Sequence, residues 1–361
     1  MNTYILSPMP LSVAGTTLKD LFYLVGGNPG NLVFFDAVKQ QVKYDGIYDI
    51  NSWNAESLSS DGSIIVPSSN FIRHVKNDPF FQNFINFLNR TDNPITLCGL
   101  GAQGTKVFNT PKKLVSILNK DQLRFFKMLS ERAVSLGIRG EFTAECLDLM
   151  GIHNYRIIGC PSLFKYMDGI FPDVASPRKN NMQMTVTSGD SRKTKVLEMG
   201  MKYDCFWIKQ SFSEFLQYTK NGKCLSPKWV LRNFPGKLSV VKNIPEYHAR
   251  KAKIFFDINE WNNFYQEKKV GFAFGTRFHG NMCALRNGVP AVWVIHDTRT
   301  KELTEFLHLP RINMNSFMKV KHIEELFDIC DYSEVQSHYG CLLSNYVKYL
   351  EENNISHYFT L

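Results

Sequence analysis

The chain has 361 residues, 44% of them hydrophobic, and a net charge of +9, which is an ordinary apolar content for a globular protein with room for two cores. No apolar run approaches the about 20 residues that a membrane-spanning helix needs. Residues 1–18 also lack the basic and apolar segments of a signal peptide, so we expect a cytoplasmic protein.

The eight cysteines are scattered along the chain, with no Cys-x-x-Cys pair and no cluster of cysteine with histidine. A structural zinc site needs such spacing, and disulfide frameworks are typical of short secreted chains. We therefore expect reduced, mostly buried thiols and no metal site.

The positive charge is concentrated between residues 220 and 269, where eleven Lys and Arg accompany four acidic residues. Such a segment can attract nucleic acid, anionic lipid or an anionic small substrate. It can equally be a solvated surface without a partner.

The first half alternates strand-like and helix-like segments, as expected of an α/β domain. Strands are predicted at residues 4–6, 63–67, 94–98, 133–138 and 155–161. Helices are predicted at 32–42, 71–89 with a break near Pro79, 120–132 and 141–150. A linker rich in Pro, Ser and Asn follows at 173–181.

The pattern then restarts, with strands predicted at 182–187, 204–208 and 238–242 and a terminal helix at 333–353. We expect two Rossmann-like domains, at residues 1–172 and 182–332, that face a cleft. The remaining segment, 333–361, carries the terminal helix and is free to pack back across both domains.

The most informative segment joins a strand at 270–274 to a short helix ending at 287–288 and a further strand at 290–295. Its turn reads Gly-Thr-Arg-Phe-His-Gly-Asn-Met at 275–282. Ligands of open α/β sheets bind where strands end and helices begin, and a helix N-terminus favours an anion. Arg277 and His279 in this turn therefore predict a site for a negatively charged substrate.

Arg277 and His279 can address one ligand only if Arg277 lies at or before the first helical turn, since residues two apart on a regular helix point about 200° apart. Gly275 makes that placement plausible. In the structural alternative, His279 faces Cys283, one turn later, as a half-buried side chain.

Asp297 and Arg299 follow the strand at 290–295 and so lie at the same sheet edge as Arg277. They either bind substrate or pair with each other or with Glu302.

Arg139 also follows a predicted strand and precedes a helix, so one arginine from each domain could clamp a dianion by bidentate contacts. An ion pair of Arg139 with Glu141 or Glu145 is the structural alternative.

Asn28, Gly30 and Asn31 open the first long helix, where glycine permits close approach and asparagine caps the helix or binds a sugar hydroxyl. The Gly-Leu-Gly run at 99–101 does not complete a dinucleotide-binding motif, and the chain has no P-loop, HExxH, GxSxG or DxD element.

The segments 275–282, 288–291 and 296–303 together resemble the C-terminal signature of the polysaccharide pyruvyl transferase family. Asn-Pro-Gly-Asn at 28–31, Arg-Gly-Glu-Phe-Thr at 139–143 and Gly-Cys-Pro-Ser at 159–162 resemble its N-terminal helix opening, its mid-chain arginine motif and the end of its first domain. The match spans about residues 20 to 310. The chain departs from the pattern at 67–70, Pro-Ser-Ser-Asn, where relatives often carry a glycine-rich turn.

The resemblance implies a two-domain fold similar to GT-B glycosyltransferases. It also implies transfer of a pyruvyl group from phosphoenolpyruvate to a pair of sugar hydroxyls, which gives a cyclic ketal on a cell-surface polysaccharide or its lipid-linked precursor, without a metal or organic cofactor. By this resemblance His279 and Arg277 are catalytic and Arg139 binds the donor. The further substrate-binding candidates are Thr276, Phe278, Asn281, Asn28, Asn31, Asp297 and Arg299.

The implied chemistry agrees with the residues. Phosphoenolpyruvate carries a phosphate of about −2 and a carboxylate, so it needs several cations. Ketal formation requires protonation of the methylene carbon, a role that His279 could fill as a general acid while Arg277 and Arg139 stabilise the anionic groups.

Two other functions stay open. A nucleotide-sugar glycosyltransferase would use the same helix terminus for a diphosphate, and a non-catalytic protein would use its basic surface to bind nucleic acid or anionic membrane. In the favoured function the partners are phosphoenolpyruvate and a glycan or lipid-linked acceptor, with no nucleic acid. The segment 220–269 leaves open a peripheral contact with the inner membrane face.

Overall fold

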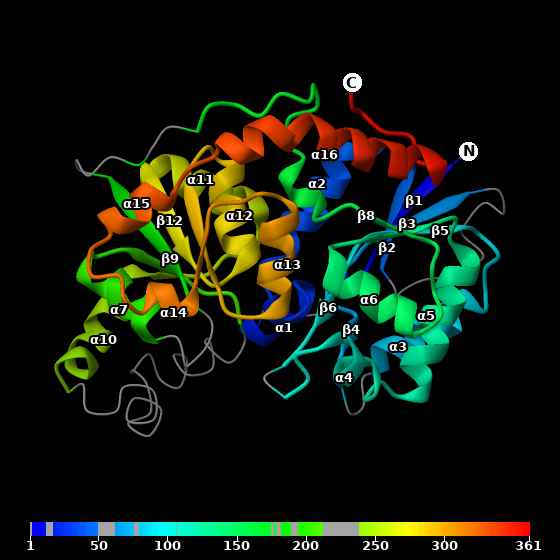
Figure 1. Ribbon diagram of the computed structural model, residues 1–361, viewed down its shortest axis with the longest axis horizontal. Coiled ribbons are helices and arrows are strands. Elements are labelled where there is room, and N and C mark those ends of the chain that lie inside the picture. Colours follow the sequence, from blue (N-terminus) through cyan, green and yellow to red (C-terminus); the bar gives the residue numbers. More distant parts are fainter. Residues whose placement is uncertain are drawn as a thin grey trace.

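The computed structural model describes residues 2–11, 17–49, 62–75, 79–105, 107–174, 177, 182–188, 194–211 and 238–361. Two parallel six-stranded sheets lie side by side in it (Figure 1), with the orders β2-β1-β3-β5-β7-β8 and β11-β10-β9-β12-β13-β14. Helices cover both sheets, which confirms the expected α/β class with two Rossmann-like halves.

The first half builds the first sheet. Its strands are β1 (Thr3–Ser7), β2 (Gly46–Asp49), β3 (Ser63–Pro67), β5 (Ile95–Leu100), β7 (Leu136–Ile138) and β8 (Tyr155–Ile157). Its helices are α1 (Leu18–Leu24), α2 (Asn31–Gln41), α3 (Pro79–Leu88), α4 (Pro111–Val115), α5 (Lys120–Arg132) and α6 (Glu141–Leu149). Two short strands, β4 (Ile72–Arg73) and β6 (Ala102–Gln103), pair beyond the ends of β3 and β5.

The second half builds the second sheet. Its strands are β9 (Gln183–Thr187), β10 (Phe206–Ile208), β11 (Ala252–Lys253), β12 (Val270–Gly275), β13 (Ala291–Ile295) and β14 (Arg311–Asn313). Its helices are α7 (Thr194–Lys202), α10 (Leu238–Lys251), α11 (Ile258–Glu267), α12 (Phe278–Arg286), α13 (Thr298–Phe306), α14 (Met314–Phe317) and α15 (Glu324–Ile329). The long helix α16 (Ser333–Glu352) follows.

Side-chain capping fixes where several helices begin. The Asn119 side chain accepts a hydrogen bond from Gln122 N at 2.9 Å, and the Gln122 side chain accepts one from Asn119 N at 3.2 Å. This capping box satisfies amide groups that a helix start leaves free, and α5 then runs over Lys120–Arg132, the predicted bounds.

One predicted element is wrong and another is right only in part. Residues 238–242, predicted as a strand, open α10, because the apolar residues Leu238, Val241 and Ile244 recur at helical spacing. Within residues 71–89, α3 (Pro79–Leu88) confirms the predicted helix and the break near Pro79, but Ile72–Arg73 form β4 instead of helix. Proline fits the first helical turn, where its missing N–H costs nothing.

Parts of three predicted segments lie outside the described residues. These are residues 76–78 of the predicted helix at 71–89, residues 175–176 and 178–181 of the predicted linker, and residues 220–237 of the basic segment. The domain bounds stay a prediction.

Helix α16 ties the two sheets together, and it runs across both of them in Figure 1. Next to its first residue, the Tyr332 hydroxyl accepts from Ala291 N of β13 at 2.9 Å and donates to Ala291 O at 3.0 Å. Near its end, the Tyr349 hydroxyl donates to Leu97 O at 2.6 Å and accepts from Gly137 N at 3.0 Å, where the β5–β7 ladder is irregular. Each tyrosine satisfies backbone groups that would otherwise be buried without partners.

The hydrophobic core is also shared between the halves. One cluster of buried side chains includes Ile5 of β1, Phe34 of α2, Leu343 of α16 and Phe272 of β12. A second cluster packs α3, α5 and α6 on the opposite face of the first sheet. Because strand residues alternate between faces, Ile5 belongs to the first cluster and its neighbour Leu6 to the second.

The turn from β12 into α12 depends on glycine. Gly275 has a φ of +142°, and a Cβ at this position would lie 2.0 Å from Thr187 O. Thr276 N donates to the same carbonyl at 2.7 Å, so β12 ends against the end of β9. This close approach sets the position of the α12 N-terminus.

We expect Gly275→Ala to lower the free energy of unfolding by more than about 3 kcal/mol, since the new Cβ would collide with backbone as well as require an unfavourable φ. The matched control is Gly288→Ala, where φ is +76° but no atom lies within 4 Å of the added Cβ. That variant should lose only about 1–2 kcal/mol. Urea unfolding followed by circular dichroism measures both, and equal losses would contradict the collision.

Candidate functional site

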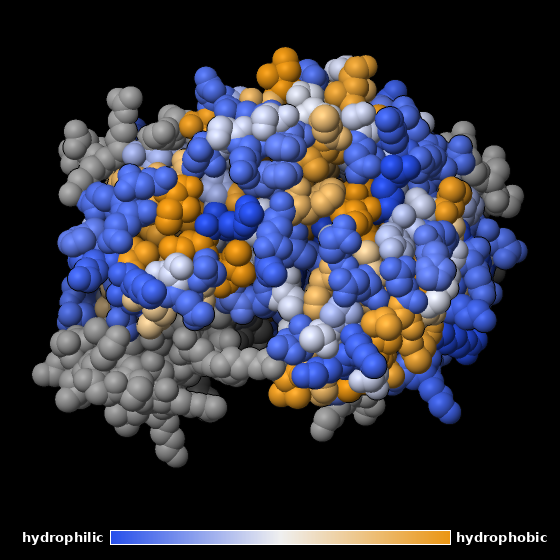
Figure 2. All heavy atoms as spheres, viewed as in Figure 1, coloured by the Kyte–Doolittle hydropathy of each residue, from blue (hydrophilic) through white to orange (hydrophobic). Residues whose placement is uncertain are grey.

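Residues that follow strands of the two halves contact one another at the junction between them. Nε2 of His279, which follows β12, lies 3.4 Å from Sγ of Cys160, which follows β8. Gly104 N, which follows β6, donates to the Thr298 hydroxyl at the start of α13 at 3.1 Å. The face drawn in Figure 2 is largely hydrophilic and is hollowed between the halves. A ligand site is therefore expected at this junction, and the predicted site residues should lie around it.

Arg139 is 1% exposed and directly follows β7. Its guanidinium donates to Asn70 Oδ1 at 2.6 Å and to Ser68 O at 3.3 Å, and its Nε has no hydrogen-bond partner among the described residues. The ion pair with Glu141 or Glu145 that the sequence leaves open is not formed. Burial lowers the pKa of Arg139, and Arg299 lowers it further. The side chain is a buried cation held by neutral oxygens.

Asp297 and Arg299 do pair, at 3.5 Å, and His296 Nε2 lies 3.2 Å from the same carboxylate oxygen. Asp297 also caps α13 by accepting from Thr300 N at 2.8 Å. Burial raises the pKa of Asp297, but Arg299 and His296 outweigh burial and hold it well below its usual range. Nε of Arg299 is buried without a hydrogen-bond partner among the described residues, so this arginine keeps an unused donor.

His279 is 8% exposed and faces the first half. Its ring lies 5.2 Å from the ring of Phe34 and contacts Cys160, so the alternative in which it faces Cys283 is wrong. Gly30 packs beside it, because a Cβ there would lie 3.2 Å from the Cβ of His279. Burial and the charges of Arg139 and Arg299 hold the pKa of His279 well below its usual range. The imidazole is therefore neutral at pH 7.

Arg277 is the N-cap of α12 and has extended backbone geometry, with φ −91° and ψ 109°. It therefore precedes the first helical turn, which is the condition for Arg277 and His279 to serve one ligand. Its backbone N–H donates to the Thr187 hydroxyl at 3.3 Å, and its side chain is only partly buried.

Three predicted binding residues lie in the interior. Asn281 donates to Gly275 O and Val292 O at 3.1 Å each and accepts from the Thr187 hydroxyl at 2.9 Å. Thr276 is fully buried, and Phe278 packs against Trp293. In this conformation these residues position the α12 N-terminus rather than line the junction.

Asn28 and Asn31 shape the loop before α2. Asn28 Oδ1 accepts from Gly30 N at 2.9 Å, and the Asn31 amide donates to Val25 O at 3.0 Å. These bonds hold Gly30 against His279. Of the predicted residues, the structure thus brings Arg139, His279 and the Asp297–Arg299 pair together around the start of α12.

The sequence analysis missed a contact between the halves made by Glu302. Its carboxylate accepts from Thr143 N at 3.0 Å and from the Thr143 hydroxyl at 2.8 Å, at the start of α6. Burial raises the pKa of Glu302 to about 7, although Thr143 and Arg139 act in the opposite direction. Glu302 of α13 is therefore hydrogen-bonded to Thr143 of α6. It does not pair with Asp297 or Arg299.

Ser68, Asn70 and Cys160 were also missed as site residues. Ser68 and Asn70 follow β3 as Arg139 follows β7, so the strand-end rule applied to every strand would have found them. Cys160 lies in the quoted 159–162 run, but nothing local indicates that its partner is 119 residues away.

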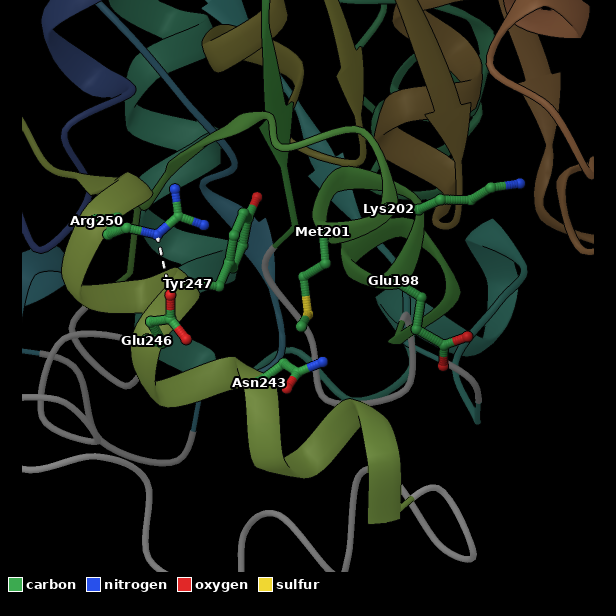
Figure 3. A pocket seen from close by; sticks show the side chains of 7 residues that line it. All are labelled: Glu198, Met201, Lys202, Asn243, Glu246, Tyr247 and Arg250. Carbon is green, nitrogen blue, oxygen red and sulfur yellow. Dashed lines mark ion pairs between the residues drawn. The ribbon is translucent and has the colours of Figure 1, made fainter.

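A separate cavity of about 490 Å³ lies between α7 and α10 on the flank of the second sheet (Figure 3). Glu246 and Arg250, one turn apart on α10, pair at 3.6 Å on one wall of this cavity. Its lining residues are Glu198, Met201, Lys202, Asn243, Glu246, Tyr247 and Arg250. None of the predicted site residues lines this cavity.

Within the described part of the chain, no group of three or more His, Cys, Asp and Glu side chains is arranged to hold a metal ion. The helices described there include none with the length and apolar content of a membrane span.

The fold and the junction define an α/β protein with a buried cationic cluster between two parallel sheets. The family model for polysaccharide pyruvyl transferases matches residues 28–298, most of the chain, which therefore belongs to the polysaccharide pyruvyl transferase family. Membership assigns it a transferase activity in polysaccharide biosynthesis and implies a glycan acceptor. No protein of curated function matches the chain.

Several solved structures show a low similarity. The S. aureus MnaA–UDP structure is 11% identical with a TM-score of 0.42 and full coverage of both chains. The UDP-GlcNAc 2-epimerase from Neisseria meningitidis is 11% identical with a TM-score of 0.41, over 98% of this chain and 100% of its own. The lipopolysaccharide outer core galactosyltransferase WaaB is 10% identical with a TM-score of 0.42, over 98% of each chain. Similarity at this level carries no inference about function.

Glu302 predicts a specific pH dependence of stability. Its pKa is about 7 in the folded protein and about 4.5 when unfolded, so the folded state holds its proton more tightly. The associated stability is fully present below pH 4.5 and is lost as the pH rises through 7. Relative to Glu302→Gln, which keeps an acceptor for Thr143, the wild type should lose up to about 3 kcal/mol over that range. Urea unfolding of both proteins at pH 4.5 and 8 tests this, and parallel pH profiles would contradict it.

Proposed function

We propose that the protein transfers a pyruvyl group from phosphoenolpyruvate to two hydroxyl groups of a glycan acceptor. The observation that supports this most strongly is the buried guanidinium of Arg139, which has no carboxylate partner among the described residues and lies near a second arginine, Arg299. A buried positive charge without a counter-ion is costly unless a ligand supplies the negative charge.

Phosphoenolpyruvate suits this cluster because it carries both a phosphate and a carboxylate. In the proposal, Arg139 and Arg277 hold these two groups from opposite halves of the protein, and the free N–H groups at the start of α12 contribute further donors. Arg299, oriented by Asp297, adds positive charge on the second half. Neither a metal nor an organic cofactor takes part.

The neutral state of His279 fits the proton balance of the reaction. Phosphoenolpyruvate and a diol give a ketal carboxylate and hydrogen phosphate. One hydroxyl proton ends on the methylene carbon, which becomes methyl, and the other ends on the departing phosphate. A neutral imidazole can take a hydroxyl proton and pass it to the carbon, so His279 acquires within the site the proton that it delivers as general acid.

The acceptor in this proposal is a cell-surface polysaccharide or its lipid-linked precursor, modified on the cytoplasmic side. The basic segment 220–269 would contact the pyrophosphate of a lipid-linked acceptor or the anionic membrane surface. No nucleic acid is involved.

Donor binding is tested by calorimetry with phosphoenolpyruvate. We expect saturable binding by the wild type and an affinity at least about 10-fold weaker in Arg139→Gln and Arg277→Ala, since each loses a charge-assisted contact. Arg124→Gln on the exposed face of α5 removes the same charge elsewhere and should bind normally. Binding of nucleotide sugars with no response to phosphoenolpyruvate would instead select a glycosyltransferase.

Catalysis is tested with His279→Ala. We expect turnover to fall by about 10²–10⁴-fold while the phosphoenolpyruvate Kd changes little, because the imidazole transfers protons and does not neutralise the donor. The assay is phosphate release from phosphoenolpyruvate with methyl glycosides of galactose, mannose, glucose and N-acetylglucosamine. The control is His153→Ala, at an exposed histidine that follows α6. Retained turnover in His279→Ala would exclude the proton-transfer role.

A further inference from the structure

Cys160 makes a contact with His279 that the proposed reaction does not yet use. The thiol is fully buried, and its Sγ lies 3.4 Å from His279 Nε2 and 3.0 Å from Ser162 Oγ. The three groups form a chain of hydrogen-bonding atoms from the first half of the protein to the catalytic candidate on the second half.

The thiol is held rigidly, because the 3₁₀ turn at Pro161–Leu163 that follows it is anchored on two sides. The buried amide of Gln41 donates to Pro161 O at 2.8 Å and to Phe164 O at 2.6 Å, and its oxygen accepts from the Tyr346 hydroxyl of α16 at 3.1 Å. Arg286 of α12 donates to Ser162 O at 3.1 Å. Neither the turn nor the thiol can move away from the imidazole without breaking these bonds.

The imidazole is confined as well. The rings of Phe34 and Phe278 each lie 5.2 Å from the imidazole ring, centroid to centroid. With Nε2 against Cys160, the other ring nitrogen, Nδ1, has no hydrogen-bond partner among the described residues. A histidine whose two nitrogens differ in this way has its tautomer set by the one that is hydrogen-bonded.

We propose that Cys160 is a positioning residue that engages Nε2 of His279, so that Nδ1 is the atom that exchanges a proton with the substrate. This inference rests on the proposed pyruvyl transfer. The thiol S–H donates a hydrogen bond to Ser162 Oγ, so the sulfur remains free to accept a hydrogen bond from Nε2–H of His279. Nδ1 is then unprotonated and can accept a proton from the acceptor hydroxyl. Arg139 and Arg299, the charged groups that act on this ring, disfavour a second proton.

The tautomer can be measured directly in the full-length protein labelled with ¹⁵N-histidine, with the His279 signals assigned from their loss in His279→Gln. We expect one neutral tautomer at pH 7 in the wild type, with a proton on Nε2 and none on Nδ1. Cys160→Ser keeps a side chain that can accept a hydrogen bond from Nε2–H, and this variant should retain the same tautomer. Cys160→Ala should give a mixture. The same tautomer ratio in all three proteins, or a proton on Nδ1 in the wild type, would overturn the proposal.

Turnover separates positioning from packing. With the phosphate-release assay, we expect Cys160→Ala to lower kcat by about 10–100-fold and to shift its pH profile, with the phosphoenolpyruvate Kd unchanged, and Cys160→Ser to recover most of the loss. A merely structural role would lower stability without moving the pH profile, and that result would overturn the proposal. A wild type without turnover on any glycoside would count against pyruvyl transfer itself, whereas the tautomer would still report the Cys160 contact.

Discussion

The junction between the two halves depends on the buried positive charge of Arg139, which forms no ion pair with a carboxylate among the described residues. Asn70 Oδ1 and Ser68 O accept hydrogen bonds from Arg139, but neutral oxygens do not cancel its charge. The nearest acidic groups neutralise little of the charge on Arg139. Asp297 is paired with Arg299, and the pKa of Glu302 is raised to about 7, so its proton is only partly released at neutral pH. The junction between the halves therefore carries an excess of positive charge, which is the condition for holding a strongly anionic small molecule.

The sequence predicts structure that depends on residues close together in the chain, but it does not predict contacts between residues far apart in the chain. The β12–α12–β13 unit and the position of Arg139 after β7 follow from runs of apolar residues and the glycines between them. The proposed ion pair of Arg139 with Glu141 or Glu145 failed because it relied on neighbours in the chain. Its actual partners, Ser68 and Asn70, are about 70 residues away and reach it because β3, β5 and β7 are adjacent in the sheet. The strand predicted at 238–242 failed differently, since this short apolar run taken alone fits a strand or a helix, and only the continuation of the spacing to Ile244 indicates a helix.

Residues outside the recognised sequence motifs hold the site residues in position. The hydroxyl of Tyr346 on α16 holds Gln41, and Gln41 in turn holds the turn that carries Cys160. Tyr332 and Tyr349, at the two ends of the same helix, bond to backbone groups of the two sheets. One helix thus sets both the relation between the halves and the placement of the thiol at their junction. No pattern in residues 333–353 predicts this, because each bond depends on which backbone groups the sheets leave unsatisfied.

The positive charge of the arginines around His279 has two opposing effects on the proposed reaction. In the proposed reaction, the positive charge around His279 would attract the anionic donor, but the same charge lowers the pKa of the imidazole and so disfavours the proton that a general acid needs. The conflict disappears if the donor arrives first, because its phosphate and carboxylate offset the arginines and allow the imidazole to accept a proton. The acceptor hydroxyl can supply that proton at the moment when its oxygen must become nucleophilic. Binding of the donor would then prepare the histidine, and an empty site would keep it neutral, so that protonation of the enol carbon is coupled to the presence of both substrates.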